Sequence, residues 1–344
     1  LSPFGIVPAA LIGLDAAKIA AKVTEIATVC APSAPSGANE GAALGVYLAT
    51  AAQNGRDKIT ILTDREFDSF GSWLEQLIAE SSGKLGRGIV PIDIEPELAP
   101  ADYAKDRAFV YVNFSGEKQP FVDALIEAGQ PVLTIKLTDK YDLFREFYRW
   151  EIAISVACAL INVNAFDQPN VQDSKTRTIA KVNDFKKNGK LDELSVSWRG
   201  EGVEAYFNFD NEEMKNAKTV KEFIAAYLKL AKSGEDYVAI NAYIPRNDET
   251  LRTLQSFRAS ILKATNCATT LGFGPRFQHS TGQLHKGGAN NGVFIQLVAD
   301  APKDTEIPGE GMSFATFERA QALGDFDALL AVDRRAIRLN LGAV

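Results

Sequence analysis

The sequence predicts an α/β protein in which a doubly wound parallel sheet is followed by a second α/β subdomain. Three observations support this fold class. Short β-branched runs alternate with helical patterns in the first half of the chain, and a similar alternation resumes after a polar stretch near its middle. With 344 residues, 46% of them hydrophobic and 24% charged, the chain can also bury a large core and divide into domains.

Four apolar runs of the first half are typical of buried parallel strands. They are Lys58 to Leu62, Ile89 to Ile94, Ala108 to Phe114 and Pro131 to Leu137. Helical patterns lie at Ala42 to Gln53, at the stripe of Phe70, Trp73, Leu74, Leu77 and Ile78, at Pro120 to Ala128 and at Leu143 to Ile161. In doubly wound sheets, ligands bind outside the carboxyl ends of the strands.

The segment Asn183 to Glu193 is polar and without periodicity, so we expect it to be the domain boundary. Domains are therefore predicted at residues 1–182 and 194–344. In the second domain, strands are expected at Glu204 to Phe209, Tyr237 to Ile244, Gly292 to Ala299 and Ile337 to Leu341. Helices are expected there at Val220 to Ala231, Asp248 to Lys263 and Ser313 to Leu330. The sequence itself shows no internal repeat.

The composition narrows the class of protein. A formal charge of -7, without a local basic patch, disfavours nucleic acid and anionic membranes as partners. Cys30, Cys158 and Cys267 are far apart and form no CxxC, so we expect no disulfide framework and a cytoplasmic location. The apolar stretch Leu1 to Leu14 lacks the features of a signal peptide or a membrane span. Because the chain opens without Met in a Pro- and Gly-broken segment, we expect a preceding N-terminal lobe to be missing.

The end of the stripe helix, WLEQLIAESSGK, places a candidate general base at Glu80. Glu80 falls at the edge of the expected buried face, and Gln76 lies one turn before it on the same side. Both side chains would then point into one cleft, where a partly buried carboxylate can accept protons. The alternative is a solvated surface Glu, which is the commoner situation for a single carboxylate.

The segment NAFDQPNVQDSK is expected to begin a second functional helix. Asp167 or Gln168 can cap it with Pro169 at its first position, so Lys175 would project from the same face as Gln168, two turns on. The ammonium group of Lys175 and the amide of Gln168 would then point to the same place. The alternative is a capped helix whose Lys is solvated.

Both histidines, His279 and His285, lie in the segment Gly272 to Phe294, which also has six glycines and the pair Ser280 and Thr281. This composition indicates a loop whose backbone comes close to a ligand such as a sugar or an anion. The alternative is a structural, hydrogen-bonded His. Because no second cluster of metal ligands stands nearby in the sequence, we predict no metal site. Motifs for dinucleotide binding, Walker-type phosphoryl transfer and α/β-hydrolase chemistry are absent from the sequence.

Together these segments resemble phosphoglucose isomerase, and most closely the isomerase half of bifunctional transaldolase/glucose 6-phosphate isomerase proteins. The opening LSPFGIVPAALIGLD is similar to the family's segment after its GGR-S motif, and GRDKITIL to its next strand. ESSGK resembles the ESNGK/ESEGK signature, HSTGQLHKGG the HSxGQ segment, and FDQPNVQDSK the FDQPGVExxK signature. The resemblance implies a sugar-isomerase (SIS-like) domain at residues 1–182 and a C-terminal subdomain with the His279 segment at residues 194–344.

The resemblance also implies an activity, the interconversion of glucose 6-phosphate and fructose 6-phosphate. Glu80 would move a proton between C1 and C2 through a cis-enediol, while His279 and Lys175 handle ring opening. Four further residues are assigned to substrate binding: Gln76, Gln168, Ser280 and Thr281. The isomerisation is redox neutral and calls for no cofactor, and the expected partner is a sugar phosphate.

Two departures from the family keep other hypotheses open. The His segment follows the Lys segment, whereas in the ordinary family it closely follows the Glu motif, and the Ser/Thr-rich phosphate motif and the GGR arginine are absent from the sequence. The rival hypothesis is a non-catalytic sugar-phosphate-binding regulator. A third is a structural fragment that completes a site on another chain. Homo-oligomerisation and fusion to a transaldolase domain are left open.

Overall fold

The computed structural model describes residues 2–35, 37–301 and 303–343, which form two compact units. Unit 1 takes residues 1–82, 87–94 and 107–167, and unit 2 takes 83–86, 95–106 and 168–344. Two short pieces of the first half of the chain therefore belong with the second half. Of the second piece, Glu95 accepts hydrogen bonds from the backbone N–H and the hydroxyl of Thr269, at 2.6 and 2.9 Å. Leu1 and Val344, the outer ends of the predicted domains, lie outside the described residues.

Unit 1 is built on a parallel sheet with the strand order β2-β1-β3-β4. Its strands are β1 (Lys58–Thr63), β2 (Val90–Asp93), β3 (Arg107–Asn113) and β4 (Val132–Lys136). Its helices are α1 (Pro3–Leu11), α2 (Ala16–Val29), α3 (Glu40–Gln53), α4 (Asp68–Ser82), α5 (Gln119–Glu127) and α6 (Asp142–Leu160). Each predicted strand and each predicted helix of this half is present.

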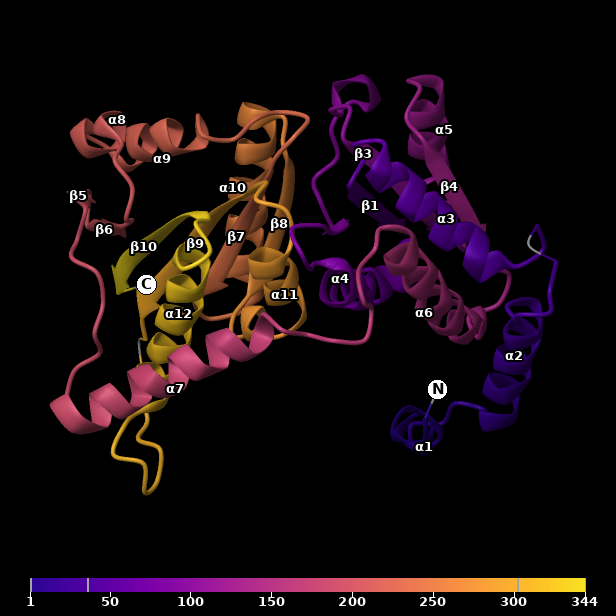
Figure 1. Cartoon of the computed structure of the whole chain (residues 1–344), viewed down its shortest axis with the longest axis horizontal. Coiled ribbons are helices and arrows are strands. Elements are labelled where there is room, and N and C mark those ends of the chain that lie inside the picture. The colour runs from indigo at the N-terminus through magenta and orange to yellow at the C-terminus, as the bar shows by residue number, and fades with distance from the viewer. Residues whose placement is uncertain (1, 36, 302, 344) are drawn as a thin grey trace. The chain divides into compact units, whose positions relative to one another are not determined.

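The sheet of unit 1 is doubly wound, as the sequence predicts. From β1 the chain passes through α4 to β2 on one side, and from β3 it passes through α5 to β4 on the other, so right-handed crossovers place α4 and α5 on opposite faces. Helices α3, α4 and α6 pack together on one face (Figure 1), where Leu48, Leu74 and Trp150 share a core with Val110 of β3.

After β1 and after β3 the chain continues toward opposite edges of the sheet, so the space between the ends of these two strands is the topological switch point. The side chain of Asp64 fills it. Its carboxylate accepts a 2.6 Å hydrogen bond from the Tyr111 hydroxyl and backbone bonds of 2.6 to 3.3 Å from the loop after β3. The backbone donors are Phe114, Ser115, Gly116 and Lys118. Burial raises the pKa of Asp64, but these hydrogen bonds outweigh burial and lower it to about 2. The ligand position of this sheet is thus filled by the chain's own carboxylate.

Unit 2 has a mixed sheet with the order β5-β6-β10-β9-β7-β8, in which β5, β6 and β10 pair antiparallel and the other neighbours are parallel. Its strands are β5 (Trp198–Gly200), β6 (Val203–Tyr206), β7 (Tyr237–Tyr243), β8 (Ala268–Phe273), β9 (Gly292–Asp300) and β10 (Arg335–Ala343). Its helices are α7 (Val171–Asn188), α8 (Glu212–Asn216), α9 (Val220–Leu228), α10 (Asp248–Thr265), α11 (Ser280–Gly287) and α12 (Phe314–Leu330).

The core of unit 2 repeats the topology of unit 1. Strands β8-β7-β9-β10 stand in the same relation as β2-β1-β3-β4, a repeat that the sequence did not reveal. Helices α9 and α10 share a core with one face of the sheet, while α7, α11 and α12 pack against one another (Figure 1). The segment Asn183 to Glu193, predicted as the domain boundary, lies within unit 2, and its residues 183–188 complete α7.

No helix among residues 2–35, 37–301 and 303–343 is long and apolar enough to cross a membrane. The three cysteines are buried.

Candidate functional site

The candidate base Glu80 lies in the last turn of α4, in unit 1. Glu80 is half-buried, and Gln76, one turn earlier, is exposed. Their four-residue separation puts both side chains on the same side of α4, as the sequence predicts. Phe70, Leu74 and Ile78 of the predicted stripe are buried on the other side of the helix.

The ESSGK motif continues past α4 into a turn that belongs to unit 2. The carbonyl oxygen of Gly83 accepts a 2.9 Å hydrogen bond from the side-chain amide of Gln283. The N–H of Gly86 donates to the carbonyl of Gly287 at 2.9 Å, and Lys84 between them is only 2% exposed. The turn is therefore fixed on α11, the helix formed by the HSTGQLHKGG motif.

Gln283 brings the third motif to the same place. Its Oε1 accepts from the backbone N–H of Asn170 at 2.9 Å, and its Nε2 donates to Asn170 Oδ1 at 2.8 Å. Gln283 is fully buried, so these bonds are shielded from water. One side chain thus joins ESSGK, FDQPNVQDSK and HSTGQLHKGG. Gln283 and Asn170 both lie within these motifs, but the sequence predicts a role for neither, because spacing along the chain does not show that the motifs meet.

Lys175 lies in the second turn of α7 and is half-buried. The predicted cap at Asp167 or Gln168 is wrong. Asn170 is the N-cap residue, and it makes no side-chain cap because its amide is bonded to α11. Gln168 is exposed and precedes the cap by two residues, so it does not share a helical face with Lys175.

His279 stands at the N-cap position of α11 and is exposed. The residue before it, Gln278, donates a 2.7 Å hydrogen bond from its side chain to the hydroxyl of Thr178, which lies one turn beyond Lys175 on α7. Asn170 and Thr178 therefore tie α7 to the His279 segment on both sides of Lys175. The structure thus brings Lys175 and His279 to one region of unit 2.

The glycine-rich segment is not the open loop that its composition predicted. It forms the short helix η3 (Arg276–Gln278) and α11, and Ser280 and Thr281 at the start of α11 are 2% and 4% exposed. The expected close backbone approach exists, but it is to the protein itself, since a Cβ on Gly282 would lie 1.7 Å from the carbonyl oxygen of Phe277.

His285 follows the structural alternative. It is 4% exposed and stacks on Phe277, and burial, with Lys286 and Arg334 nearby, lowers its pKa to about 3. The imidazole is therefore neutral near neutral pH. Lys286 forms a buried 2.5 Å ion pair with Asp325 and donates to the carbonyl of Phe277 at 2.8 Å, which fixes η3 to α11.

In the described part of the chain, no group of three or more His, Cys, Asp and Glu residues is arranged to hold a metal ion. The molecule is an α/β protein of two doubly wound units, with parts of three sequence motifs joined at α11.

Comparison with known proteins finds a distant relative of assigned activity. No family model matches the chain. The glucose-6-phosphate isomerase of Acholeplasma laidlawii (strain PG-8A) is 26% identical over an alignment of 220 residues. This alignment covers 51% of this chain and 51% of the relative, so the chain spans about half the length of the curated relative that it matches. Over that part, the chain is similar to a sugar-phosphate isomerase.

Solved structures give weaker likenesses. A hypothetical protein of Thermus thermophilus has a TM-score of 0.29 at 11% identity, with 98% of this chain and 85% of that chain covered. The C-terminal domain of glucosamine-fructose-6-phosphate aminotransferase from Francisella tularensis has a TM-score of 0.27 at 10% identity, with 93% and 81% covered. At TM-scores this low, neither likeness carries an argument about this chain.

Proposed function

We propose that the chain is the isomerase part of a sugar-phosphate isomerase that interconverts glucose 6-phosphate and fructose 6-phosphate. The observation that carries the proposal is the hydrogen bonding of Gln283, which joins parts of the three motifs that resemble the family. The 26% identity to a glucose-6-phosphate isomerase supports the same class of reaction. That match covers about half of the relative. Homo-oligomerisation and fusion to a transaldolase domain are therefore proposals as well.

Glu80 is the proposed general base. Its carboxylate takes the proton from C2 of open-chain glucose 6-phosphate and returns it to C1, while the hydroxyl proton passes from O2 to O1. The sugar is rearranged without net oxidation, so no external oxidant or reductant takes part. A positioned carboxylate contributes about 10²- to 10⁴-fold to such a proton transfer.

Lys175 and His279 are the proposed groups for ring opening, because a cation or an imidazole can polarise and protonate the ring oxygen. Gln76, Gln168, Ser280 and Thr281 are the proposed substrate-binding residues. Since the side chains of Ser280 and Thr281 are buried, they would act through the positive N-terminal end of α11, which suits a phosphate group.

The test is turnover of fructose 6-phosphate by this chain, with Glu80→Gln alongside it. We expect the variant to lose about 10²-fold or more in kcat, because an amide cannot accept the carbon-bound proton. The matched control is Glu127→Gln, an exposed residue at the end of α5, which should keep full activity.

A measurement of fructose 6-phosphate binding distinguishes the proposed isomerase from its rival, a non-catalytic sugar-phosphate-binding module. If both proteins bind the sugar phosphate equally and neither converts it, catalysis is wrong and the chain is a sugar-phosphate-binding module. If neither protein binds or converts it, the assignment to sugar phosphates is itself contradicted for this chain.

A further inference from the structure

A cavity of about 510 Å³ lies within unit 2, at the carboxyl ends of β7 and β9. The chain leaves β7 toward β8 on one side and β9 toward β10 on the other, so this is the switch point of the sheet, where α/β proteins bind ligands. The equivalent position of unit 1 is filled by Asp64. In unit 2 the position is hollow, and its volume suits a small metabolite.

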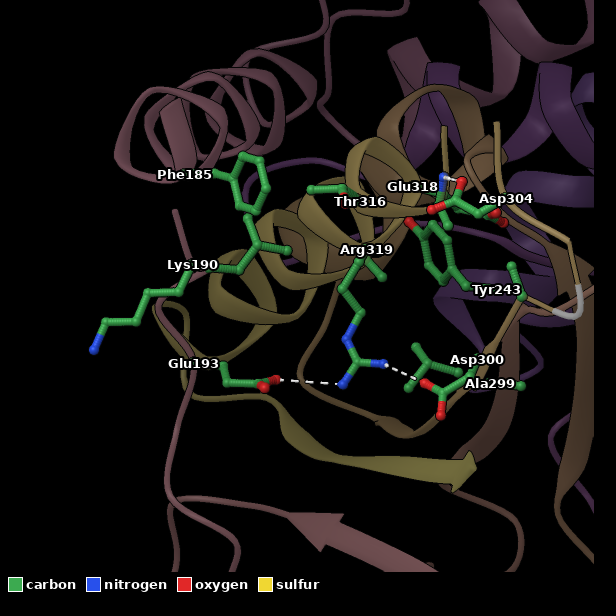
Figure 2. A pocket seen from close by; sticks show the side chains of 15 residues that line it. Phe185, Lys190, Glu193, Tyr243, Ala299, Asp300, Asp304, Thr316, Glu318 and Arg319 are labelled. Atoms are coloured by element: carbon green, nitrogen blue, oxygen red, sulfur yellow. Dashed lines mark hydrogen bonds and ion pairs between the residues drawn. The ribbon is translucent and has the colours of Figure 1, made fainter. Parts of the chain in front are cut away.

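Arg319 projects from α12 into this cavity, between Glu193 and Asp300 (Figure 2). Its guanidinium nitrogens lie 3.6 Å from Glu193 Oε2 and 3.9 Å from Asp300 Oδ1, both too long for hydrogen bonds. Glu193 is hydrogen-bonded to Arg338 instead. Arg319 therefore keeps a planar set of donors directed at the cavity, and such a fork matches a carboxylate.

Tyr243 supplies a second unused group. It is 4% exposed, lines the cavity at the end of β7, and its hydroxyl has no hydrogen-bond partner among the described residues. A buried hydroxyl without a partner is unfavourable, so a ligand atom that bonds to it would bind more tightly. Tyr243 and Arg319 both line this cavity (Figure 2).

The charges of the lining exclude a phosphate ester. Four carboxylates face two cations there: Glu193, Asp300, Asp304 and Glu318 against Lys190 and Arg319. The first N–H groups of α12 are also already used, since Phe314 donates to the carbonyl of Thr305 and Ala315 to Asp304. A dianion would meet net negative charge and no open helix end. A ligand with one carboxylate and one cationic group fits better.

We propose that this cavity binds a small α-amino acid with an apolar side chain. Its carboxylate takes the donors of Arg319, and its ammonium group binds Asp300, which now stands 3.9 Å from the guanidinium. The Tyr243 hydroxyl bonds to the polar end of the ligand. The apolar lining, which includes Phe185, Leu191 and Val298, receives the side chain. The site is separate from the isomerase proposal, since it uses none of the residues of that proposal.

The experiment is titration calorimetry of the intact chain with L-leucine, without any sugar phosphate. Two half-ligands are compared, 4-methylpentanoate without the ammonium group and 3-methylbutylamine without the carboxylate. We expect leucine to bind and each half-ligand to bind about tenfold or more weakly, because each loses a charge-assisted hydrogen bond. Arg319→Gln should weaken leucine binding by about the same factor.

Tyr243→Phe keeps the packing and should weaken leucine binding about threefold without lowering the melting temperature, because its hydroxyl has no partner to lose. The control is Arg199→Gln, an Arg paired with Glu204 outside the cavity lining, which should bind leucine as the wild type does. The proposal is overturned if leucine does not bind, if 4-methylpentanoate binds equally well, or if folded Arg319→Gln binds leucine unchanged. Isomerase activity is measured separately, so its failure leaves this result standing.

Discussion

Gln283 shows how a single buried side chain can join three segments of the chain. Its amide group accepts one hydrogen bond and donates two, to groups from two other segments of the chain. An amide is suited to this position because it offers both a donor and an acceptor at one end of a short side chain. The roles of Glu80, Lys175 and His279 are predicted from the chemistry of their side chains, whereas the role of Gln283 follows from its contacts in the folded chain.

Replacement of Gln283 by Leu should destabilise unit 2. The N–H of Asn170 and the carbonyl of Gly83 would lose their partners in a buried place, and we expect a loss of about 2 to 4 kcal/mol in the free energy of unfolding. Urea unfolding followed by circular dichroism measures this. Gln172→Leu, at an exposed position of α7, is the matched control and should stay within about 0.5 kcal/mol of the wild type. Equal stability of the two variants would show that Gln283 is not the link we describe.

At the scale of the element, α11 is the least expected part of the fold. Every residue from Ser280 to Gly287 is buried, although Ser, Thr and Gly have low helix propensities. The helix is maintained by its surroundings, through the Lys286–Asp325 ion pair and contacts made where glycines leave no Cβ. By contrast, the four strands of unit 1 were predicted to within one residue at either end, because each contains a short run rich in apolar residues, and β1, β2 and β3 are buried along most of their length.

Gly282→Ala should disrupt α11. The added Cβ would stand 1.7 Å from the carbonyl oxygen of Phe277 and 2.8 Å from Lys286 Nζ, so backbone must move. We expect a loss of about 2 kcal/mol or more, as for other overpacked positions. Gly5→Ala in α1 is the control, because nothing lies within 4 Å of its Cβ, and there the helix propensity of Ala favours the variant. A thermal melt in which both variants match the wild type would contradict the packing around α11.

At the scale of the whole molecule, the two units share one sheet topology but differ at the switch point of the sheet. Unit 1 fills its switch point with Asp64, while unit 2 leaves a cavity. The sequence predicted two α/β regions, but it did not show that residues 83–86 and 95–106 belong with the second unit. It also missed β8, because Thr and Gly interrupt the apolar run of this strand.

Glu146, a buried carboxyl group of α6, is expected to make the stability of unit 1 depend on pH. Glu146 is 1% exposed, and Arg149 is 3.0 Å away. Burial raises its pKa from 4.5 to about 7, although Arg149 and Arg145 act in the opposite direction, while Glu40 and Asp142 add to the rise. The folded state therefore binds this proton more tightly than the unfolded state does, so stability falls as the pH rises between these two values.

Glu146→Gln should remove this dependence. At pH values below about 4.5 the variant and the wild type should be equally stable, and above about pH 7 the variant should be more stable by on the order of 2 kcal/mol. Urea unfolding at several pH values, followed by tryptophan fluorescence, to which buried Trp150 in the same helix contributes, makes the comparison. A wild-type stability that rises through this range relative to the variant would show that the carboxyl group is ionised and well paired.

The sequence by itself determined the fold class, most strands and helices, and the motif segments with their candidate residues, because apolar periodicity and residue type are local properties. Only the tertiary structure decided that Gly83, Asn170 and Gln283 meet, that Ser280 and Thr281 are buried, and that α11 is a helix. It also decided that one switch point is filled and the other hollow. The hydrogen bonds of Gln283 join it to Asn170 and Gly83, 113 and 200 positions away, and the Lys286–Asp325 pair of α11 spans 39 positions. A buried polar group therefore finds its partner by where the folded chain returns.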